Sequence, residues 1–260
     1  MNYLYIYLIL LAYFLIWYVI AQIKKNNGLV DIAWGMGIVV SAVSSLILGD
    51  QYTITGLIVT GLTIIWGLRL SLYLFKRNFN KEEDFRYQNF RKKWKTHVKL
   101  KALLYVFLTQ SIFSYIIALP IILTNLISNK TFDMVSIILV SLGALIFFIG
   151  FIFEVLADHS LQRFKKDPSN KGKIMQKNVW KFSRHPNYFG EATLWWGIGI
   201  ATLGTMNIIS FIGLISPLII TYLLLYVTGV PLLEKKYKTN LAYQAYASKT
   251  SIFFPLPPKK

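Results

Sequence analysis

The residues best suited to chemistry lie at the start of one apolar segment, between positions 178 and 203. In chain order they are Ser183, Arg184, His185, Pro186, Asn187, Tyr188 and Glu191. Pro186 suits the first position of a helix, where its missing N–H costs nothing. Asn187 and Glu191 would then share one helix face. A carboxylate one turn inside an apolar helix needs a partner or a polar cavity. The pattern therefore favours the wall of a ligand site, and the alternative is a membrane helix anchored by a basic loop.

A polar stripe closes the preceding apolar run. Glu154, Asp158, Gln162 and Lys165 fall on one face of a predicted helix. Two carboxylates four residues apart repel each other unless they are protonated, bridged or hydrogen-bonded to a ligand. The stripe thus predicts ligand binding. The alternative is a purely structural stripe that pairs with Arg69 or Arg184.

Three further places combine polar and apolar residues. Asp31 lies just inside an apolar run, either as a functional carboxylate or as a charge that suits a helix N-terminus. Arg69 and Tyr73 share a helix face near the end of the next run. The last polar segment joins Glu234 to Tyr237, Tyr243 and Tyr246, a spacing that suggests a short helix lying back against the rest of the protein.

Apolar helices must position these polar side chains. The chain has 260 residues, of which 55% are hydrophobic, and its mean hydropathy is +0.50. Backbone polar groups in lipid must be satisfied within the segment, so repeated apolar runs predict membrane helices. We expect an all-α membrane protein, one integral membrane domain over residues 1–260. Its seven predicted spans are about 3–22, 29–48, 53–74, 102–126, 134–157, 187–204 and 207–229.

The basic residues predict the orientation of these spans. A net charge of +17 resembles that of a nucleic-acid-binding protein, but its distribution argues against nucleic acid. All the Lys and Arg residues except Arg69 and Lys130 lie on alternate loops or in the tail. The positive-inside rule then places the N-terminus outside and the C-terminus in the cytosol, which agrees with an odd number of spans. Some of this charge can meet anionic lipid head groups.

The segments between the spans carry two further patterns. Tyr87, Phe90 and Trp94 recur at helical spacing and predict an amphipathic helix between the third and fourth spans. Gly35 and Gly37 lack the third glycine of a dinucleotide-binding loop, and instead favour close helix packing.

The sequence does not indicate a metal site or a disulfide bond. The chain has no Cys, and its three histidines at 97, 159 and 185 are widely scattered. We predict no metal site, and no obligate protein partner is evident. The polar groups collect instead at the cytosolic helix ends, where a pocket would let a charged cofactor meet a lipid-soluble substrate. Cations of the loop at 163–185 could hold its phosphates.

A family resemblance follows from these motifs. The run from Lys181 to Glu191, Lys-Phe-Ser-Arg-His-Pro-Asn-Tyr-Phe-Gly-Glu, resembles the C-terminal motif of the steroid 5α-reductase superfamily, as does the Trp-Trp-Gly at 195–197. The resemblance is specific over about residues 150–258. The bacterial branch of that superfamily is also similar at 31–35, 66–71 and 83–87.

The resemblance implies an enzyme of the bacterial cytoplasmic membrane. It would use NADPH to reduce a carbon–carbon double bond conjugated to a carbonyl in a steroid, polyprenyl or acyl-type lipid. Tyr73 and Asp31 would polarise the carbonyl as catalytic residues. Asp158, Asn187 and Glu191 match cofactor-binding positions, whereas Glu154 stands where the reductases tend to carry Asn. The predicted cofactor-binding set is Glu154, Asp158, Gln162, Lys165, Arg184, His185, Asn187, Tyr188, Glu191, Glu234, Tyr237 and Tyr246.

Two alternatives remain open. The Arg-His-Pro-x-Tyr-x-Gly run at 184–190, with the later Glu and Tyr-x-x-Tyr, is also similar to isoprenylcysteine carboxyl methyltransferases and phospholipid methyltransferases. That reading implies S-adenosylmethionine as the cofactor. A transporter or a non-catalytic lipid-binding protein would use the same charges within the membrane as an ion path.

Overall fold

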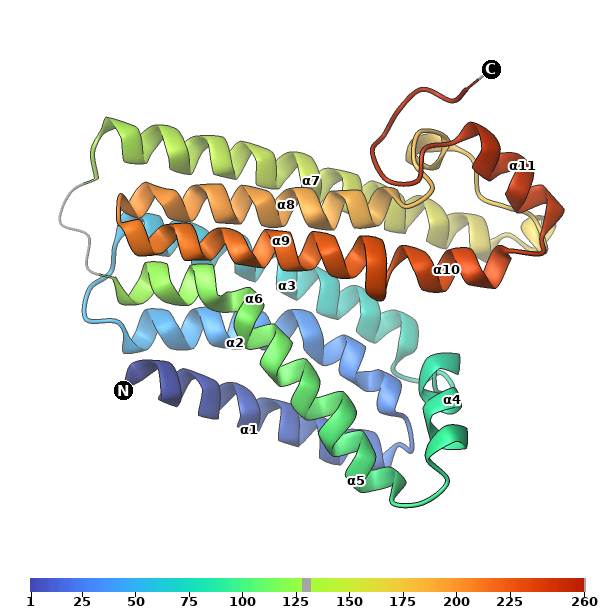
Figure 1. Ribbon diagram of the computed structural model, residues 1–260, viewed down its shortest axis with the longest axis horizontal. Coiled ribbons are helices and arrows are strands. Elements are labelled where there is room, and N and C mark those ends of the chain that lie inside the picture. Colours follow the sequence, from blue (N-terminus) through green and yellow to red (C-terminus); the bar gives the residue numbers. More distant parts are fainter. Residues whose placement is uncertain (128–131, 260) are drawn as a thin grey trace. The chain divides into compact units, whose positions relative to one another are not determined.

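The structure describes residues 1–127 and 132–259 in a computed structural model, and all the regular secondary structure in this part of the chain is helical (Figure 1). Lys130 lies outside the described residues. The α-helices are α1 (Asn2–Ile23), α2 (Val30–Leu48), α3 (Ile54–Asn78), α4 (Phe85–Trp94), α5 (Val98–Ala102), α6 (Thr109–Leu126), α7 (Met134–Lys166), α8 (Pro186–Thr202), α9 (Ile215–Tyr222), α10 (Val230–Tyr237) and α11 (Leu241–Lys249). Short 3-10 or π-helical turns are η1 (Asn27–Leu29), η2 (Leu103–Leu108), η3 (Pro168–Asn170), η4 (Asn178–Lys181), η5 (Leu203–Thr205), η6 (Ile208–Leu214) and η7 (Leu223–Val227).

Six helical segments of the described residues are long and apolar enough to cross a membrane. They are Asn2–Ile23, Asn27–Leu48, Ile54–Asn78, Val98–Leu126, Met134–Lys166 and Ile208–Lys235. Each overlaps one predicted span, so the expectation of an all-α integral membrane protein is confirmed at that level. The remaining predicted span is α8, which has 17 residues. A helix of that length covers about 25 Å, less than the roughly 30 Å hydrocarbon core.

The chain divides into two compact units. The first comprises Met1–Val140 with Thr202–Ser216, and the second comprises Ser141–Ala201 with Pro217–Lys260. The single domain over residues 1–260 stays a prediction. Every predicted cofactor-binding residue belongs to the second unit, and both predicted catalytic residues belong to the first.

In the first unit, α2 packs against α1, α3 and α6. Small residues make this possible, because a Cβ atom added at Gly67 of α3 would lie only 2.7 Å from the carbonyl oxygen of Gly35. A Cβ atom at Gly37 would lie 2.9 Å from the ring of Phe14 on α1. The predicted packing role of Gly35 and Gly37 is therefore confirmed.

A buried amide joins three helices of the same unit. Asn125, near the end of α6, donates through Nδ2 to the carbonyl oxygen of Ala42 at 3.2 Å. The same nitrogen lies 2.9 Å from Ser45 Oγ on α2 and 2.9 Å from Thr60 Oγ1 on α3. Because a buried polar group is costly unless it is hydrogen-bonded, this cluster favours one register of the three helices.

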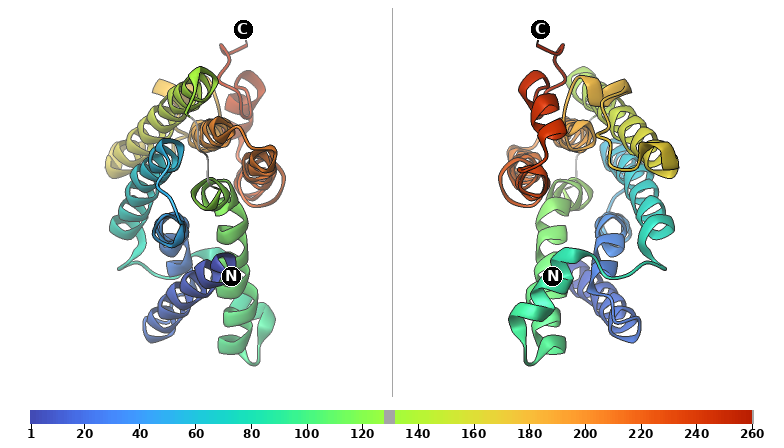
Figure 2. Two further views of the ribbon diagram at one scale, coloured as in Figure 1. Left: turned by 90° about the vertical axis from the view of Figure 1, so that its left-hand side faces the viewer. Right: turned by 90° about the vertical axis from the view of Figure 1, so that its right-hand side faces the viewer.

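In the second unit, α8 lies between α7 and the helix formed by α9 and α10 (Figure 2). The backbones of α7 and α8 approach closely where glycines face each other, since a Cβ atom added at Gly150 would lie 2.5 Å from the carbonyl oxygen of Gly190. On the other side of α8, Trp196 donates through its indole N–H to Thr221 Oγ1 of α9 at 3.2 Å. The tight contact between α7 and α8 holds the polar ends of both helices in place.

Candidate functional site

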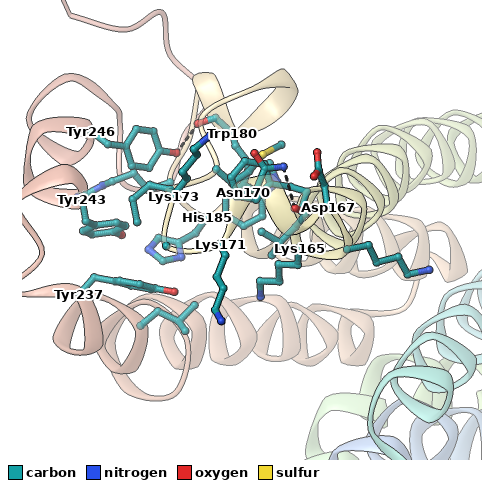
Figure 3. Close-up of a pocket in the computed structure, with 18 of the residues that line it drawn as sticks. Lys165, Asp167, Asn170, Lys171, Lys173, Trp180, His185, Tyr237, Tyr243 and Tyr246 are labelled. Atoms are coloured by element: carbon teal, nitrogen blue, oxygen red, sulfur yellow. Dashed lines mark hydrogen bonds between the residues drawn. The ribbon is translucent and has the colours of Figure 1, made fainter.

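A cavity of about 450 Å³ lies in the second unit, where the end of α7, the loop after it and the C-terminal helices meet. Cations and aromatic rings line it together. Figure 3 shows the rings of Tyr237, Tyr243 and Tyr246 on one side, with Lys165 and Asp167 on the other. The cations that line the cavity are Lys165, Lys166, Lys171, Lys173 and Arg184.

The loop after α7 folds back because local hydrogen bonds turn it. Asp167 caps the turn η3, where its carboxylate accepts from the Ser169 N–H at 2.9 Å. The side-chain amide of Asn170 donates to the carbonyl oxygen of Phe164, in the last turn of α7, at 3.1 Å. Gly172 then adopts a φ of +80°, which glycine tolerates without strain. As a result, Lys171 and Lys173 return to the same cavity as Lys165.

One carboxylate organises the opposite wall. Glu234 of α10 accepts from Arg184 Nη1 at 3.0 Å and from the Tyr243 hydroxyl at 2.8 Å. His185 Nε2 lies 2.9 Å from the same carboxylate. The His185 side chain is only 3% exposed. Burial lowers the pKa of His185 below its usual value, although the hydrogen bond to Glu234 opposes the shift. Burial, followed by the hydrogen bond to Glu234, raises the pKa of Tyr243, so this phenol stays protonated and remains a donor.

Two nitrogen atoms of this wall have hydrogen-bonding capacity to spare. Within residues 1–127 and 132–259, the buried atoms His185 Nδ1 and Arg184 Nε have no hydrogen-bond partner. Both side chains line the cavity. Because a neutral His185 that donates through Nε2 presents Nδ1 as an acceptor, the wall offers one acceptor beside a cationic donor. A ligand that fills the cavity could satisfy both.

The C-terminal segment fixes the loop that carries Arg184 and His185. The Tyr246 hydroxyl of α11 donates to the carbonyl oxygens of Trp180 and Ser183. Ser183 in turn donates through Oγ to the carbonyl oxygen of Phe253 at 2.7 Å, and the Arg184 N–H donates to the carbonyl oxygen of Ser251 at 2.8 Å. The tail predicted as one short helix forms two, with Glu234 and Tyr237 on α10 and Tyr243 and Tyr246 on α11. The second of these, α11, holds the motif loop.

The structure brings about half of the predicted cofactor-binding residues to this cavity. Lys165, Arg184, His185, Tyr237 and Tyr246 line it, and Glu234 binds two of them. The ring of Tyr188 stacks on that of His185, with the ring centroids 5.5 Å apart.

The other predicted residues lie elsewhere in the second unit. Glu154 and Asp158 are buried in α7, at 2% and 7% exposure, and Gln162 lies one turn further along. Asn187 and Glu191 are half-buried in the first turns of α8, which begins at Pro186 as predicted. Their role in cofactor binding stays a prediction.

Sequence reasoning missed several residues that line the cavity. The missed side chains include Phe164, Lys166, Lys171, Lys173, Met175 and Trp180. The sequence shows that the loop is basic. Which of its lysines line the cavity depends on how the loop folds, and the hydrogen bond between Asn170 and Phe164 helps to set that fold. Tyr243 belonged to a recognised tyrosine pattern, yet its bond to Glu234 needed the fold of the tail.

The two predicted catalytic residues have separate surroundings in the first unit. Asp31, in the first turn of α2, accepts from Arg86 Nη2 at 2.6 Å and from the Tyr87 hydroxyl at 2.7 Å. This carboxylate therefore joins α2 to α4. Tyr73 lies on α3 between two guanidinium groups, with Arg69 at 5.3 Å and Arg77 at 5.2 Å from the ring centroid. A catalytic role for either residue stays a prediction.

The two partners of Asp31, Arg86 and Tyr87, both remain protonated. Burial disfavours the Arg86 cation, but Asp31 and Asp84 outweigh that cost and raise the pKa of Arg86. Burial raises the pKa of Tyr87, and the Asp31 charge raises it further. Glu83 binds Arg91 at 2.6 Å and accepts from the Asn27 N–H at 2.7 Å. These contacts dock the amphipathic helix α4, confirming that this segment is helical and ordered.

Comparison with known protein families matches residues 17–250 to the family described as "Protein of unknown function (DUF1295)". The chain belongs to this DUF1295 family. The matched range includes Asp31, Tyr73 and every predicted cofactor-binding residue. No curated protein and no solved structure matches the chain significantly. Membership of DUF1295 does not itself assign a reaction to the cavity.

Proposed function

We propose that this protein is a membrane oxidoreductase that uses NADPH to reduce a double bond conjugated to a carbonyl in a lipophilic substrate. The observation that carries the proposal is the cavity at the end of α7, which combines five cations with aromatic rings next to His185. The reductase-like motif at 181–191 supplies the reaction class as an expectation, and the cavity supplies the match to the cofactor.

Charge favours a phosphorylated cofactor over S-adenosylmethionine. NADPH carries a pyrophosphate and a 2′-phosphate, and lysine and arginine are the usual partners of phosphate oxygens. S-adenosylmethionine carries no phosphate, and its sulfonium cation would be repelled by Lys165, Lys171 and Lys173. Asp167 is the one acidic residue among the residues that line this cavity. The methyltransferase alternative therefore ranks second.

The rings suit the planar parts of the same cofactor. Tyr237 and Tyr243 stack on each other with centroids 4.9 Å apart, and both line the cavity with Trp180. Aromatic side chains bury large flat areas and favour stacked or edge-on partners. An adenine or nicotinamide ring could pack against this group, while His185 Nδ1 and Arg184 Nε meet its polar atoms.

The residues of the chain would divide the work as follows. NADPH held in this cavity would supply the hydride that reduces the β-carbon of the substrate. Tyr73 donates a hydrogen bond and then a proton to the carbonyl oxygen, where negative charge develops. Asp31 already accepts from Arg86 and Tyr87, so in this proposal it positions α4 and does not donate the proton. Arg184, His185 and Glu234 hold the cofactor.

The proposal includes seven spans, with α8 as the short sixth span, the N-terminus outside and the C-terminus in the cytosol. The basic segments at 76–101 and 163–184 then share the cytosolic side of a bacterial cytoplasmic membrane. The cavity would be open to soluble NADPH, and the substrate would arrive from the bilayer. A lipid-soluble enone, a steroid or polyprenyl compound for example, fits that route.

Binding experiments can test this proposal directly. The purified full-length protein in detergent is titrated with NADPH and with S-adenosylmethionine, using nicotinamide fluorescence and calorimetry. We expect NADPH to bind, and the double variant Lys171→Gln/Lys173→Gln to bind it at least about tenfold more weakly, because charge-assisted phosphate contacts are lost. The double variant Lys177→Gln/Lys249→Gln, at two exposed lysines that do not line the cavity, is the matched control. Binding of S-adenosylmethionine alone would favour the methyltransferase, and binding of neither would favour a transporter or lipid-binding protein.

A further inference from the structure

A second basic surface lies in the first unit, on α4 and α5. Residues 85–132 contain no Asp or Glu, whereas positions 92, 93, 95, 99 and 101 are all lysine. A stretch of this length without a single acid must find its counter-charges elsewhere.

The neighbouring acids do not neutralise these lysines. Glu83 is bound to Arg91, and Asp31 and Asp84 are both bound to Arg86. Lys101 donates to the carbonyl oxygen of Trp94 at 3.1 Å. The remaining four lysines, Lys92, Lys93, Lys95 and Lys99, are exposed. Within the described part of the chain, none of these four has a carboxylate at ion-pair distance, so their charge is uncompensated.

Exposed apolar side chains accompany the lysines. Phe90 stacks on Trp94 with centroids 5.4 Å apart and a 14° angle between the rings, and Tyr105 lies 6.4 Å from Trp94. Tyr105 is 65% exposed and Leu100 is 53% exposed. Rings and aliphatic groups beside lysines are typical of a surface that meets the boundary between head groups and acyl chains.

The position along the chain agrees with that boundary. The apolar segment Val98–Leu126 is one of the candidate spans, and the exposed lysines stand just before it or in its first turn. A membrane span that begins at Val98 would place the ammonium groups of these lysines at the level of the lipid phosphates. Tyr105 and Leu100 then lie on the acyl side of the same surface.

We propose that this surface, formed by Phe90, Lys92, Lys93, Lys95, Lys99 and Tyr105 and here called the α4–α5 patch, binds the head groups of anionic phospholipids. The lysines bind the phosphate and the additional negative charge of the lipid, and the apolar side chains contact its acyl chains. Charge complementarity selects anionic over zwitterionic lipids, because a zwitterionic head group brings its own cation. This inference does not depend on the proposed reductase activity.

The test measures which lipids the full-length protein retains. The protein is reconstituted in nanodiscs with equal amounts of phosphatidylglycerol and phosphatidylcholine, transferred to mild detergent, and its bound lipids are counted by native mass spectrometry. We expect the protein to retain phosphatidylglycerol preferentially. In the variant Lys92→Gln/Lys93→Gln/Lys95→Gln/Lys99→Gln, the ratio of bound phosphatidylglycerol to bound phosphatidylcholine should fall at least about tenfold. Each lysine near an anionic surface contributes to the attraction.

Two further variants separate the patch from charge in general. Replacing the same four lysines with arginine keeps the charge and should keep the preference within about twofold. The control Lys177→Gln/Lys238→Gln/Lys249→Gln/Lys259→Gln removes equal charge from exposed positions of the other unit and should also stay within about twofold. A melting curve for each variant verifies folding.

The proposal is overturned by any of four results. The wild-type protein could retain both lipids equally, or the patch variant could keep the full preference. The control could also lose as much preference as the patch variant, which would assign the effect to net charge. Excess inorganic phosphate should leave the bound phosphatidylglycerol in place, and complete displacement would indicate a site for small anions instead.

Discussion

Two carboxylates of this protein sit in nearly the same chemical surroundings and are expected to do different work. Asp31 accepts from Arg86 and the Tyr87 phenol, and Glu234 accepts from Arg184 and the Tyr243 phenol. The first arginine also binds a second acid, Asp84. In the second network, Arg184 Nε and His185 Nδ1 are buried without partners among the described residues, beside a cavity.

Unpartnered buried atoms beside a cavity distinguish a ligand site from a structural ion pair. An Arg–carboxylate–Tyr cluster satisfies its own groups when every donor and acceptor is used within the protein. The same cluster becomes a candidate binding site when buried atoms are left over and adjoin open volume. By this criterion the network of Glu234 prepares a ligand site. Arg86 and Tyr87, the direct partners of Asp31, leave no such buried atom among the described residues, so Asp31 docks α4 onto α2. The unpartnered atoms Arg91 Nη2 and Asn27 Nδ2 lie at the neighbouring contacts of Glu83 instead.

The largest expected effect concerns turnover, and it tests whether the first unit supplies the proton. Tyr73→Phe removes the proposed phenol donor and should lower turnover by on the order of a hundredfold or more. The affinity for NADPH should stay within about twofold, because the cavity belongs to the other unit. NADPH oxidation with a panel of enone lipids measures the rate, and Tyr52→Phe, at an exposed position, is the control. Wild-type turnover in Tyr73→Phe would remove Tyr73 from the mechanism.

The matched pair Glu234→Gln and Asp31→Asn tests the comparison itself. Each substitution keeps the shape of the side chain and removes its charge. Glu234→Gln should raise the Kd for NADPH by about tenfold, because it removes the charge that positions Arg184 and replaces one of the two oxygens that bind Arg184 and His185 with an NH2 donor.

Asp31→Asn should leave that Kd unchanged and lower the unfolding free energy by about 1 kcal/mol, a small value because the ion pair with Arg86 is partly exposed. Calorimetric titration and thermal unfolding measure the two quantities. If Asp31→Asn weakens NADPH binding as much as Glu234→Gln does, the distinction between the two networks is wrong.

Acidification should affect the two networks differently. The folded-state pKa of His185 lies below its ordinary value of about 6.5. The unfolded state therefore binds more protons, and stability falls as the pH drops from about 7 toward 5. His185→Gln should flatten this part of the curve of melting temperature against pH.

Asp84, which binds the same arginine as Asp31, should not change stability in that pH range. Burial disfavours ionisation of Asp84, but its hydrogen bonds with Arg86 outweigh this and lower the pKa of Asp84. Asp84 therefore contributes stability at pH values above the pKa that it has in the unfolded state. This contribution is lost only as the pH falls through its lower folded-state pKa. Asp84→Asn should leave the slope between pH 7 and 5 unchanged, in contrast to His185→Gln.

The smallest expected effects come from the two phenols. Tyr243→Phe removes a donor to Glu234 from a residue that lines the cavity, and should weaken NADPH binding about threefold to fivefold. Tyr87→Phe removes the equivalent donor to Asp31, and should cost about 1 kcal/mol of stability with no change in NADPH binding. Equal effects of both variants on NADPH binding would contradict the comparison.

Much of the fold was predictable because its signals are local. Each of the six long apolar segments overlaps a predicted span, and α8 begins at Pro186 as expected. The limit of that approach lies at the ends of elements, because the predicted span 187–204 ends two residues later than α8, whose last residue is Thr202.

The composition of the candidate site was only partly predictable, because its contacts span long separations in the chain. The predicted polar residues of α7 and α8 were selected by helical periodicity, which identifies a shared face but not what the face meets. Lys171 and Lys173 reach the cavity because the chain reverses at Gly172. Glu234 meets Arg184 across 50 residues of sequence.

The sequence by itself determined that this chain forms apolar helices, where its basic segments lie, and which residue types could bind a charged ligand. These properties follow from composition and short-range spacing, which act within a few turns of helix. Only the tertiary structure decided which carboxylate holds a helix and which borders a cavity. That choice depends on which donors and acceptors are used up by distant parts of the chain, because the free energy of a buried polar group is set by the partners that surround it.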